Sequence, residues 1–230
     1  MPSTDSSMMK KLSLCFFVGL LAISSATIGH AQQMLFGVRG GINFADQKWS
    51  SGGREGSPAN ITWRPGMIAG GEFDYSFDRS WAAIIQFLYD QKGARSNMFG
   101  IAVGPLPGPA DWIASYVEVP LLARVNIGNS EAALCPYLFA GPSVGFLISN
   151  IESHYSNSSN ITDSTTKIDF SLIAGAGLSL RLVAGAKLFL DAGYAFGLTN
   201  VDNYFNDEAN ELYVYSRDIR ISAGVLFPLN

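Results

Sequence analysis

The sequence predicts an all-β fold, an eight-stranded antiparallel up-and-down transmembrane β-barrel with four long extracellular loops and three short periplasmic turns. Three observations support this prediction. Apolar and polar side chains alternate in eight segments, the connections between the segments are alternately long and short, and the chain begins with an export signal. A period of two predicts strands, because successive side chains of a strand point to opposite faces.

Residues 1–31 are predicted to be a signal peptide that is cleaved on export. A pair of lysines precedes an apolar run at residues 12–23, and a small-x-small cleavage site follows at residues 29–31. The apolar run is too short to span a membrane as a helix. The mature chain, residues 32–230, is therefore expected to form one outer-membrane β-barrel domain.

The first four strands are predicted at residues 35–45, 67–77, 81–91 and 113–126. Each places apolar side chains on one face, with glycine, charged or other polar residues on the opposite face. The apolar faces contain Val38, Ile42 and Phe44; Phe73, Tyr75 and Phe77; Trp81, Ala83, Ile85, Phe87 and Tyr89; and Val117, Val119, Leu121, Ala123 and Val125.

The last four strands are predicted at residues 135–148, 168–181, 187–198 and 215–229. The stretch 168–181 is the clearest, because all its even positions are apolar and only Ile173 breaks the pattern. A strand of this length runs roughly 40 Å at about 3.3 Å per residue. Tilted by about 45°, it would cross roughly 30 Å, the thickness of the hydrocarbon core of a bilayer.

The connections between the predicted strands alternate between long and short. An up-and-down barrel inserted from one side has tight turns at one end and long loops at the other, so this rhythm indicates an outer-membrane barrel. The long connections are residues 46–62, 93–111, 149–166 and 200–212, and the short ones are residues 78–80, 128–131 and 182–186.

Alternation alone leaves open which face of the barrel is the inner one, since a soluble eight-stranded barrel would turn its apolar face inward. Glycine and serine crowd the polar face, as a narrow interior requires. Aromatic residues of the apolar face gather near the strand ends, as interfacial girdles do. These features favour a lipid-facing apolar surface. Pro120 and Pro142 lie inside strands, so local bulges are expected there.

The polar face carries acidic and basic residues that are predicted to fill the barrel as a salt-bridged structural network. An ion path through the barrel is the alternative interpretation. The network is predicted to contain Arg39, Glu72, Asp74, Asp90, Glu118, Arg124, Asp169, Arg181, Lys187, Asp191, Asp218 and Arg220.

No catalytic, cofactor or metal site is predicted, and the protein is not expected to be an enzyme. His154 lies among serines and acids in a polar loop, which leaves a lipid-modifying surface enzyme as a lesser alternative, but no residue fixes a catalytic geometry. The acidic loop Asp202, Asp207, Glu208 and Glu211 could hold a divalent cation near lipopolysaccharide, yet it lacks calcium-loop spacing and is better explained as a solvated loop.

The predicted partners are those of the outer membrane. The formal net charge is −4 and only 15% of the residues are charged, so nothing suggests nucleic-acid binding. Outer-membrane lipid and lipopolysaccharide are expected to surround the barrel. The loop 93–112 contains an unusual apolar run, which predicts either folding over the barrel mouth or docking of an envelope protein.

Several motifs resemble those of the small outer-membrane β-barrel family of Bacteroidota, which includes PorT-like proteins. The resemblance spans the mature chain and implies the barrel fold, with Pro120 and Pro142 as expected features. It implies no catalytic set, although some members act in secretion. The final residues depart from it, because such barrels usually end on an aromatic residue. The matching residues are 40–43, 86–93, 116–120, 140–142, 168–170, 174–177, Tyr194 and 197–198.

Together these observations predict an integral outer-membrane barrel with a side-chain-filled interior. A structural role, or binding through the extracellular loops, is the leading prediction. A narrow channel and a component of an envelope secretion system are the alternatives.

Overall fold

The computed structural model describes the strands and most of the short connections. Residues 1–32, which include the predicted signal peptide, lie outside the described residues, as do residues 97–109 of the apolar loop and residues 202–211 of the acidic loop. The described residues are 33–51, 54–56, 61–96, 110–128, 132–154, 157–160, 162, 165–201 and 212–229.

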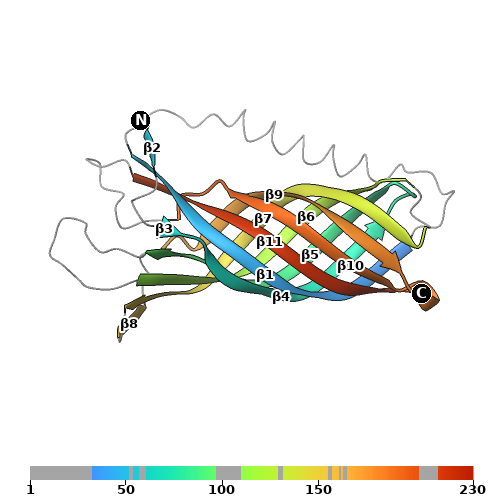
Figure 1. The fold of residues 1–230 in the computed structure, drawn as a ribbon, viewed down its shortest axis with the longest axis horizontal. Helices are drawn as coiled ribbons and strands as arrows, with labels where there is room; N and C mark the ends of the chain where they lie inside the picture. Colours follow the sequence, from blue (N-terminus) through green and yellow to red (C-terminus); the bar gives the residue numbers. More distant parts are fainter. Residues whose placement is uncertain are drawn as a thin grey trace, which may run out of the picture. The chain divides into compact units, whose positions relative to one another are not determined.

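Within these residues, eight long strands form the barrel, and three short strands pair with the ends of long ones (Figure 1). The long strands are β1 (Gln33–Ser51), β4 (Arg64–Ser76), β5 (Trp81–Ser96), β6 (Ala110–Asn126), β7 (Leu134–His154), β9 (Ile168–Arg181), β10 (Lys187–Gly197) and β11 (Leu212–Pro228). The short strands are β2 (Arg54–Gly56), β3 (Ile61–Thr62) and β8 (Asn157–Asn160).

The sheet closes on itself through its first and last long strands. β1 pairs antiparallel with β11 along its length, from Leu35 opposite Pro228 to Ser51 opposite Leu212. The other long strands pair antiparallel with their neighbours in chain order. The predicted eight-stranded up-and-down barrel is therefore confirmed.

The short turn between β4 and β5 is stabilised by the side chain of Asp78. The carboxylate of Asp78 accepts hydrogen bonds from the backbone N–H groups of Ser80 and Trp81, at 2.6 Å and 2.8 Å. The connection between β9 and β10 is also short and includes a 3₁₀ turn, Val183–Gly185. Ala184 there has φ 60°, which is uncommon for a residue other than glycine.

At the opposite end, the strands run further than the sequence predicted. β5 continues to Ser96, β6 begins at Ala110 and β7 continues to His154, where it also pairs with β8 inside a predicted loop. Hydrophobic alternation detects only the part of a strand that contacts lipid, about 9 to 11 residues. Beyond it, polar residues continue the ladder without an apolar face.

The two prolines do not produce the predicted bulges. The register between β5 and β6 is the same on both sides of Pro120, and the register between β6 and β7 is the same on both sides of Pro142. Instead, the residue pair at Pro120 is missing from the ladder between β5 and β6, and the residue pair at Pro142 is missing from the ladder between β6 and β7. Proline has no N–H group to donate to such a pair. The register shift between β6 and β7 lies instead at Ser115 and Tyr116.

The apolar face of every long strand is turned outward, and the charged face is turned inward. Leu172 is 49% exposed, whereas the neighbouring Ser171 is 3% exposed. Large apolar residues cover the outer wall, including Phe36, Phe87, Leu121 and Phe170. No helix among the described residues is long and apolar enough to cross a membrane.

Candidate functional site: the charged interior of the barrel

The interior of the barrel gathers most of the charged residues predicted to form its network. Asp191 also belongs to the interior, although its side chain is slightly more exposed than those of the buried residues, at 11%. Arg181 departs from the prediction, because its side chain is exposed at the end of β9. Alternation assigns Arg181 to the inner face but does not show that the strand ends there. The predicted residues that are buried are Arg39, Glu72, Asp74, Asp90, Glu118, Arg124, Asp169, Lys187, Asp218 and Arg220.

One group of contacts, here called the Arg39 cluster, joins strands on different sides of the barrel. Arg39 on β1 lies between two carboxylates, with Nη1 3.1 Å from Glu72 Oε2 on β4 and Nη2 2.6 Å from Asp191 Oδ2 on β10. Gln86 donates to Glu72 at 2.7 Å, and the Tyr137 hydroxyl donates to Asp191 at 3.2 Å. The Arg39 cluster is these five residues.

A second ion pair lies near the Arg39 cluster. Arg124 on β6 donates to the carboxylate of Asp74 on β4, and both side chains are at most 5% exposed. The guanidinium of Arg124 also lies over the ring of Tyr137, 5.4 Å from its centroid. Tyr137 therefore connects this pair with the Arg39 cluster.

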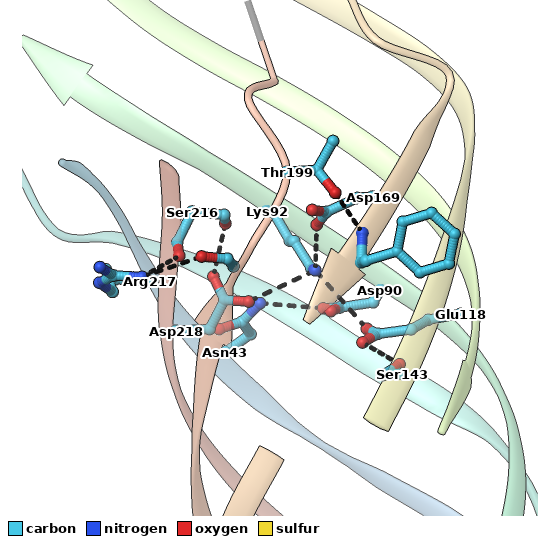
Figure 2. A network of polar contacts seen from close by, with 12 residues as sticks. Asn43, Asp90, Lys92, Glu118, Ser143, Asp169, Thr199, Ser216, Arg217 and Asp218 are labelled. Atoms are coloured by element: carbon cyan, nitrogen blue, oxygen red, sulfur yellow. Dashed lines mark hydrogen bonds and ion pairs between the residues drawn. The ribbon is translucent and has the colours of Figure 1, made fainter. Parts of the chain in front are cut away.

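A larger group, the Lys92 cluster, lies further toward the long connections (Figure 2). Lys92 Nζ on β5 is 3.0 Å from Asp169, 3.5 Å from Asp218 and 3.8 Å from Glu118. These carboxylates come from β9, β11 and β6, so one ammonium group connects four strands. The cluster comprises Lys92, Asp90, Glu118, Asp169, Asp218 and Arg220.

Arg220 on β11 is the second cation of the Lys92 cluster. Its Nη2 lies 2.9 Å from Glu118 Oε2, 3.1 Å from Asp90 Oδ2 and 3.2 Å from Asp218 Oδ2. Two polar side chains complete the group: Asn43 donates to Asp90 at 2.9 Å and Ser143 donates to Glu118 at 2.6 Å.

Apolar side chains fill the interior around these charges. Leu35, Phe189 and Leu226 form a buried cluster near the short connections, and Arg39 lies over the ring of Phe189 at 5.0 Å from its centroid. A second cluster packs beside the charged groups and contains Ile84, Leu122, Tyr137, Phe139, Ile173 and Ala195.

Aromatic rings of the interior lie directly on glycines of neighbouring strands. A methyl group at Gly177 would clash with the ring of Tyr137, and one at Gly175 or Gly193 would contact the ring of Phe139. At Gly175 and Gly177 the ring occupies the space of the missing side chain, so glycine is required there, whereas a methyl group at Gly193 would make a tight contact at 3.2 Å. This pairing explains why the inner face of a narrow barrel is rich in glycine.

Lys92 is the central residue that the sequence analysis missed. The predicted strand ended at Gln91 and the predicted loop began at Gly93, so Lys92 was assigned to neither. A signal for Lys92 was present in the sequence, because Lys92 lies two residues after Asp90 and therefore points to the same inner face in the extended part of β5.

Arg217 was also missed. Its guanidinium stacks on the ring of the exposed Phe196, 3.4 Å from the ring centroid.

The arrangement suits internal cross-linking of the barrel. Among the described residues, no group of three or more His, Cys, Asp or Glu side chains is arranged to hold a metal ion. The acidic loop 202–211 lies outside the described residues, and the side chain of His154 is likewise not described.

Comparison with known proteins gives a family match. The model of the family described as "Outer membrane protein beta-barrel domain" matches residues 30–203. No curated protein sequence matches the chain at a significant level.

Solved structures with a similar arrangement include OprG from Pseudomonas aeruginosa, with 15% identity, coverage of 86% of this chain and 98% of OprG, and a TM-score of 0.48. Ail of Yersinia pestis has 18% identity, coverage of 85% and 99%, and a TM-score of 0.41. Neisserial surface protein A has 15% identity, coverage of 84% and 97%, and a TM-score of 0.45. The assignment to a family rests on the family match, which includes more than half of the chain.

Proposed function

Because the chain belongs to the outer membrane protein β-barrel domain family and is an integral outer-membrane barrel, we propose that it serves as a non-conducting scaffold that binds partners through its long loops. The barrel would hold these loops at the cell surface, with the short turns in the periplasm. The exported N-terminus would begin in the periplasm, and an even number of strands returns the C-terminus to the same side.

The observation that supports a non-conducting barrel is the density of cross-links in its interior. Salt bridges of Arg39, Lys92 and Arg220 connect strands across the interior, and Leu35 and Phe189 pack near one end. An ion would have to displace buried, paired charges, which costs several kcal/mol per ion. The barrel is therefore best explained as a filled scaffold.

The observation that supports a binding role is a set of hydrogen bonds that fix the strand ends beyond the lipid-facing wall. Asn150 donates from its backbone to Thr162 and from its side chain to Thr165, each at 2.8 Å. Thr166 N–H donates to the carbonyl of Val201 at 3.2 Å, which ties two long connections together. A fixed platform of this kind would hold the bases of the loops in place, so the strand ends would lose little conformational entropy on binding.

We further propose the loop 93–112 as the contact for an envelope protein, and lipopolysaccharide as the lipid around the outer half of the barrel. The apolar run of this loop, from Met98 to Leu106, supports the first proposal. A relationship to PorT-like proteins of Bacteroidota, and with it a role in secretion, rests on the sequence motifs and is part of the same proposal.

Planar-bilayer recording tests the scaffold role. The wild-type barrel is expected to give no stable unitary conductance. A Phe189→Ala, Leu226→Ala double variant is expected to remain closed as well, because Leu35 and the Arg39 and Lys92 clusters still fill the interior. A steady wild-type conductance would establish a channel instead.

Deletion of residues 98–109 tests the loop. The barrel that lacks these residues is expected to fold in vesicles but to lose any envelope protein that co-purifies with the wild type.

Protease treatment of whole cells tests the topology. Added protease is expected to cut within residues 149–166, and cleavage confined to the short turns would reverse the proposed topology.

A further inference from the structure

The Lys92 cluster contains more acidic than basic groups. Its four carboxyl groups and two cations, if all were ionised, would leave a net charge of −2 inside the barrel. Excess charge in such surroundings is strongly unfavourable, because burial removes the water that stabilises it. A compensating positive charge is therefore required. The four carboxyl residues, each at most 1% exposed, are Asp90, Glu118, Asp169 and Asp218.

One nitrogen of Arg220 faces several carboxyl oxygens of the cluster. Arg220 Nη2 faces both oxygens of Glu118, at 2.9 Å and 3.1 Å, together with Asp218 Oδ2 at 3.2 Å and Asp90 Oδ2 at 3.1 Å. A terminal guanidinium nitrogen carries two hydrogens. It cannot form a full hydrogen bond with each of the four oxygens.

Two of the carboxyl groups have a donor on one oxygen only: Asp90 Oδ1 accepts from Asn43 at 2.9 Å, and Asp169 Oδ2 accepts from Lys92 at 3.0 Å. Asp90 Oδ2 and Asp169 Oδ1 are buried and have no hydrogen-bond partner. Asp90 Oδ2 is at ion-pair distance from Arg220, but the hydrogen-bond geometry is not met. In contrast, Glu118 accepts bonds from Arg220 and Ser143.

Asp218 resembles Glu118 in this respect. Its Oδ2 accepts from Arg220 at 3.2 Å, and its Oδ1 accepts from Ser216 at 3.3 Å. The charge excess and the unpartnered oxygens therefore point to the same number of groups, two, and to the same pair of residues, Asp90 and Asp169.

We propose that Asp90 and Asp169 form a buried proton-binding site, each carrying one exchangeable proton in the folded barrel. Glu118 and Asp218 are then the ionised groups that balance Lys92 and Arg220, Asp169 accepts the hydrogen bond of Lys92 through its uncharged carbonyl oxygen, and the cluster is neutral. The side chains that face it from the other elements are uncharged: Asn43 from β1, Ile68 from β4, Tyr116 from β6, Ser143 from β7 and Ala195 from β10.

The site makes folding depend on proton concentration. The unfolded carboxyl groups have released their protons at neutral pH, so unfolding releases two protons and becomes easier as the pH rises. The unfolding equilibrium constant is expected to increase about 100-fold per pH unit for two protons and about tenfold for one. Urea unfolding in phosphatidylcholine vesicles, followed by tryptophan fluorescence between about pH 6 and about pH 8, measures this slope.

Neutral isosteric variants assign the protons. Asp90→Asn and Asp169→Asn each replace a protonated acid by an uncharged amide, so each is expected to fold and to reduce the slope to about tenfold per pH unit. The double variant is expected to lose the slope. The matched control is Ser143→Ala, which removes an uncharged donor to Glu118 and is expected to lower stability slightly while keeping the steep slope.

Infrared spectroscopy gives a direct readout that packing changes do not reproduce. The folded wild type is expected to show the carbonyl band of protonated carboxylic acids, which the Asp90→Asn, Asp169→Asn double variant lacks. A wild-type slope near zero without this band would overturn the proposal. So would a stability that responds to sodium or calcium concentration rather than to pH, because a bound cation would then supply the missing charge.

Discussion

Arg39 Nη2 lies 2.6 Å from Asp191 Oδ2, although 152 residues separate them in the chain. The contact joins β1 to β10 through the interior of the barrel, past the strand that lies between them in the sheet. It therefore adds a link that the backbone ladder does not provide.

Reversing the charge of Asp191 is expected to destabilise the barrel by about 3 to 5 kcal/mol, because Asp191→Arg leaves two buried cations facing each other. Combining it with Arg39→Asp is expected to recover part of this loss. A double-mutant cycle of urea unfolding in vesicles measures the coupling. Additive effects of the two substitutions would contradict a direct pair.

Leu172→Arg is expected to lower the free energy of unfolding by about 2 to 4 kcal/mol, because Leu172 faces lipid near the middle of the wall. Its neighbour Ser171 faces the interior, so Ser171→Ala is the matched control and should change stability little. The measurement is unfolding in bilayers. A tolerated arginine at position 172 would mean that this face of β9 is not in contact with lipid.

Gly177→Ala is expected to cost about 1 to 3 kcal/mol, because the added methyl group displaces the ring of Tyr137. Gly40→Ala is the control on the outer wall, where the nearest atom to an added methyl group is 3.9 Å away. Comparing their thermal unfolding separates loss of space from the general effect of replacing glycine. Equal effects would show that the ring does not occupy the position over Gly177.

Acid is expected to weaken the ion pair of Arg95 and Asp111 outside the membrane-spanning part of β5 and β6. The hydrogen bonds from Arg95, at 2.6 Å and 2.9 Å, hold the pKa of Asp111 below its usual value. The stabilisation is present above the unfolded pKa of about 3.9 and is lost as the pH falls through the lower folded value. The pair is partly exposed, so the effect is small.

The pKa of Asp111 can be followed directly by NMR titration of its side-chain carboxyl carbon. Arg95→Gln is expected to raise the titration midpoint toward the usual value. An unchanged midpoint in this variant would show that Arg95 does not stabilise the ionised carboxylate.

The barrel itself could be predicted from the sequence because lipid imposes one rule on every strand. Every strand that crosses the bilayer places an apolar side chain at alternate positions to contact lipid, whatever the tilt of the strand. Eight such segments therefore indicate eight strands. β9 was predicted with its observed bounds, Ile168–Arg181, because both its ends coincide with the end of the alternation. The ends of β5 and β7 were not predicted, because the last residues of these strands lie beyond the part of the strand that contacts lipid.

The interior contacts could be predicted only as a group. Alternation shows that Arg39 and Asp191 share the inner face, but the register and the tilt of the strands decide that they meet. The same information places Asp90 and Asp169 with Lys92 rather than with Arg124. The exposure of Arg181 depends on where β9 ends relative to the rim, which alternation does not record.

The pairing of β1 with β11 determines when the barrel can be completed. The two strands come from opposite ends of the chain, so this contact has the longest loop to close and cannot begin before the last residues are available. Until then both edges present unpaired N–H and C=O groups, which are costly in lipid and prone to pair with other chains. A chain truncated before β11 would therefore remain an open sheet, and its partly assembled form would require an external strand or a chaperone to cover the edge of β1.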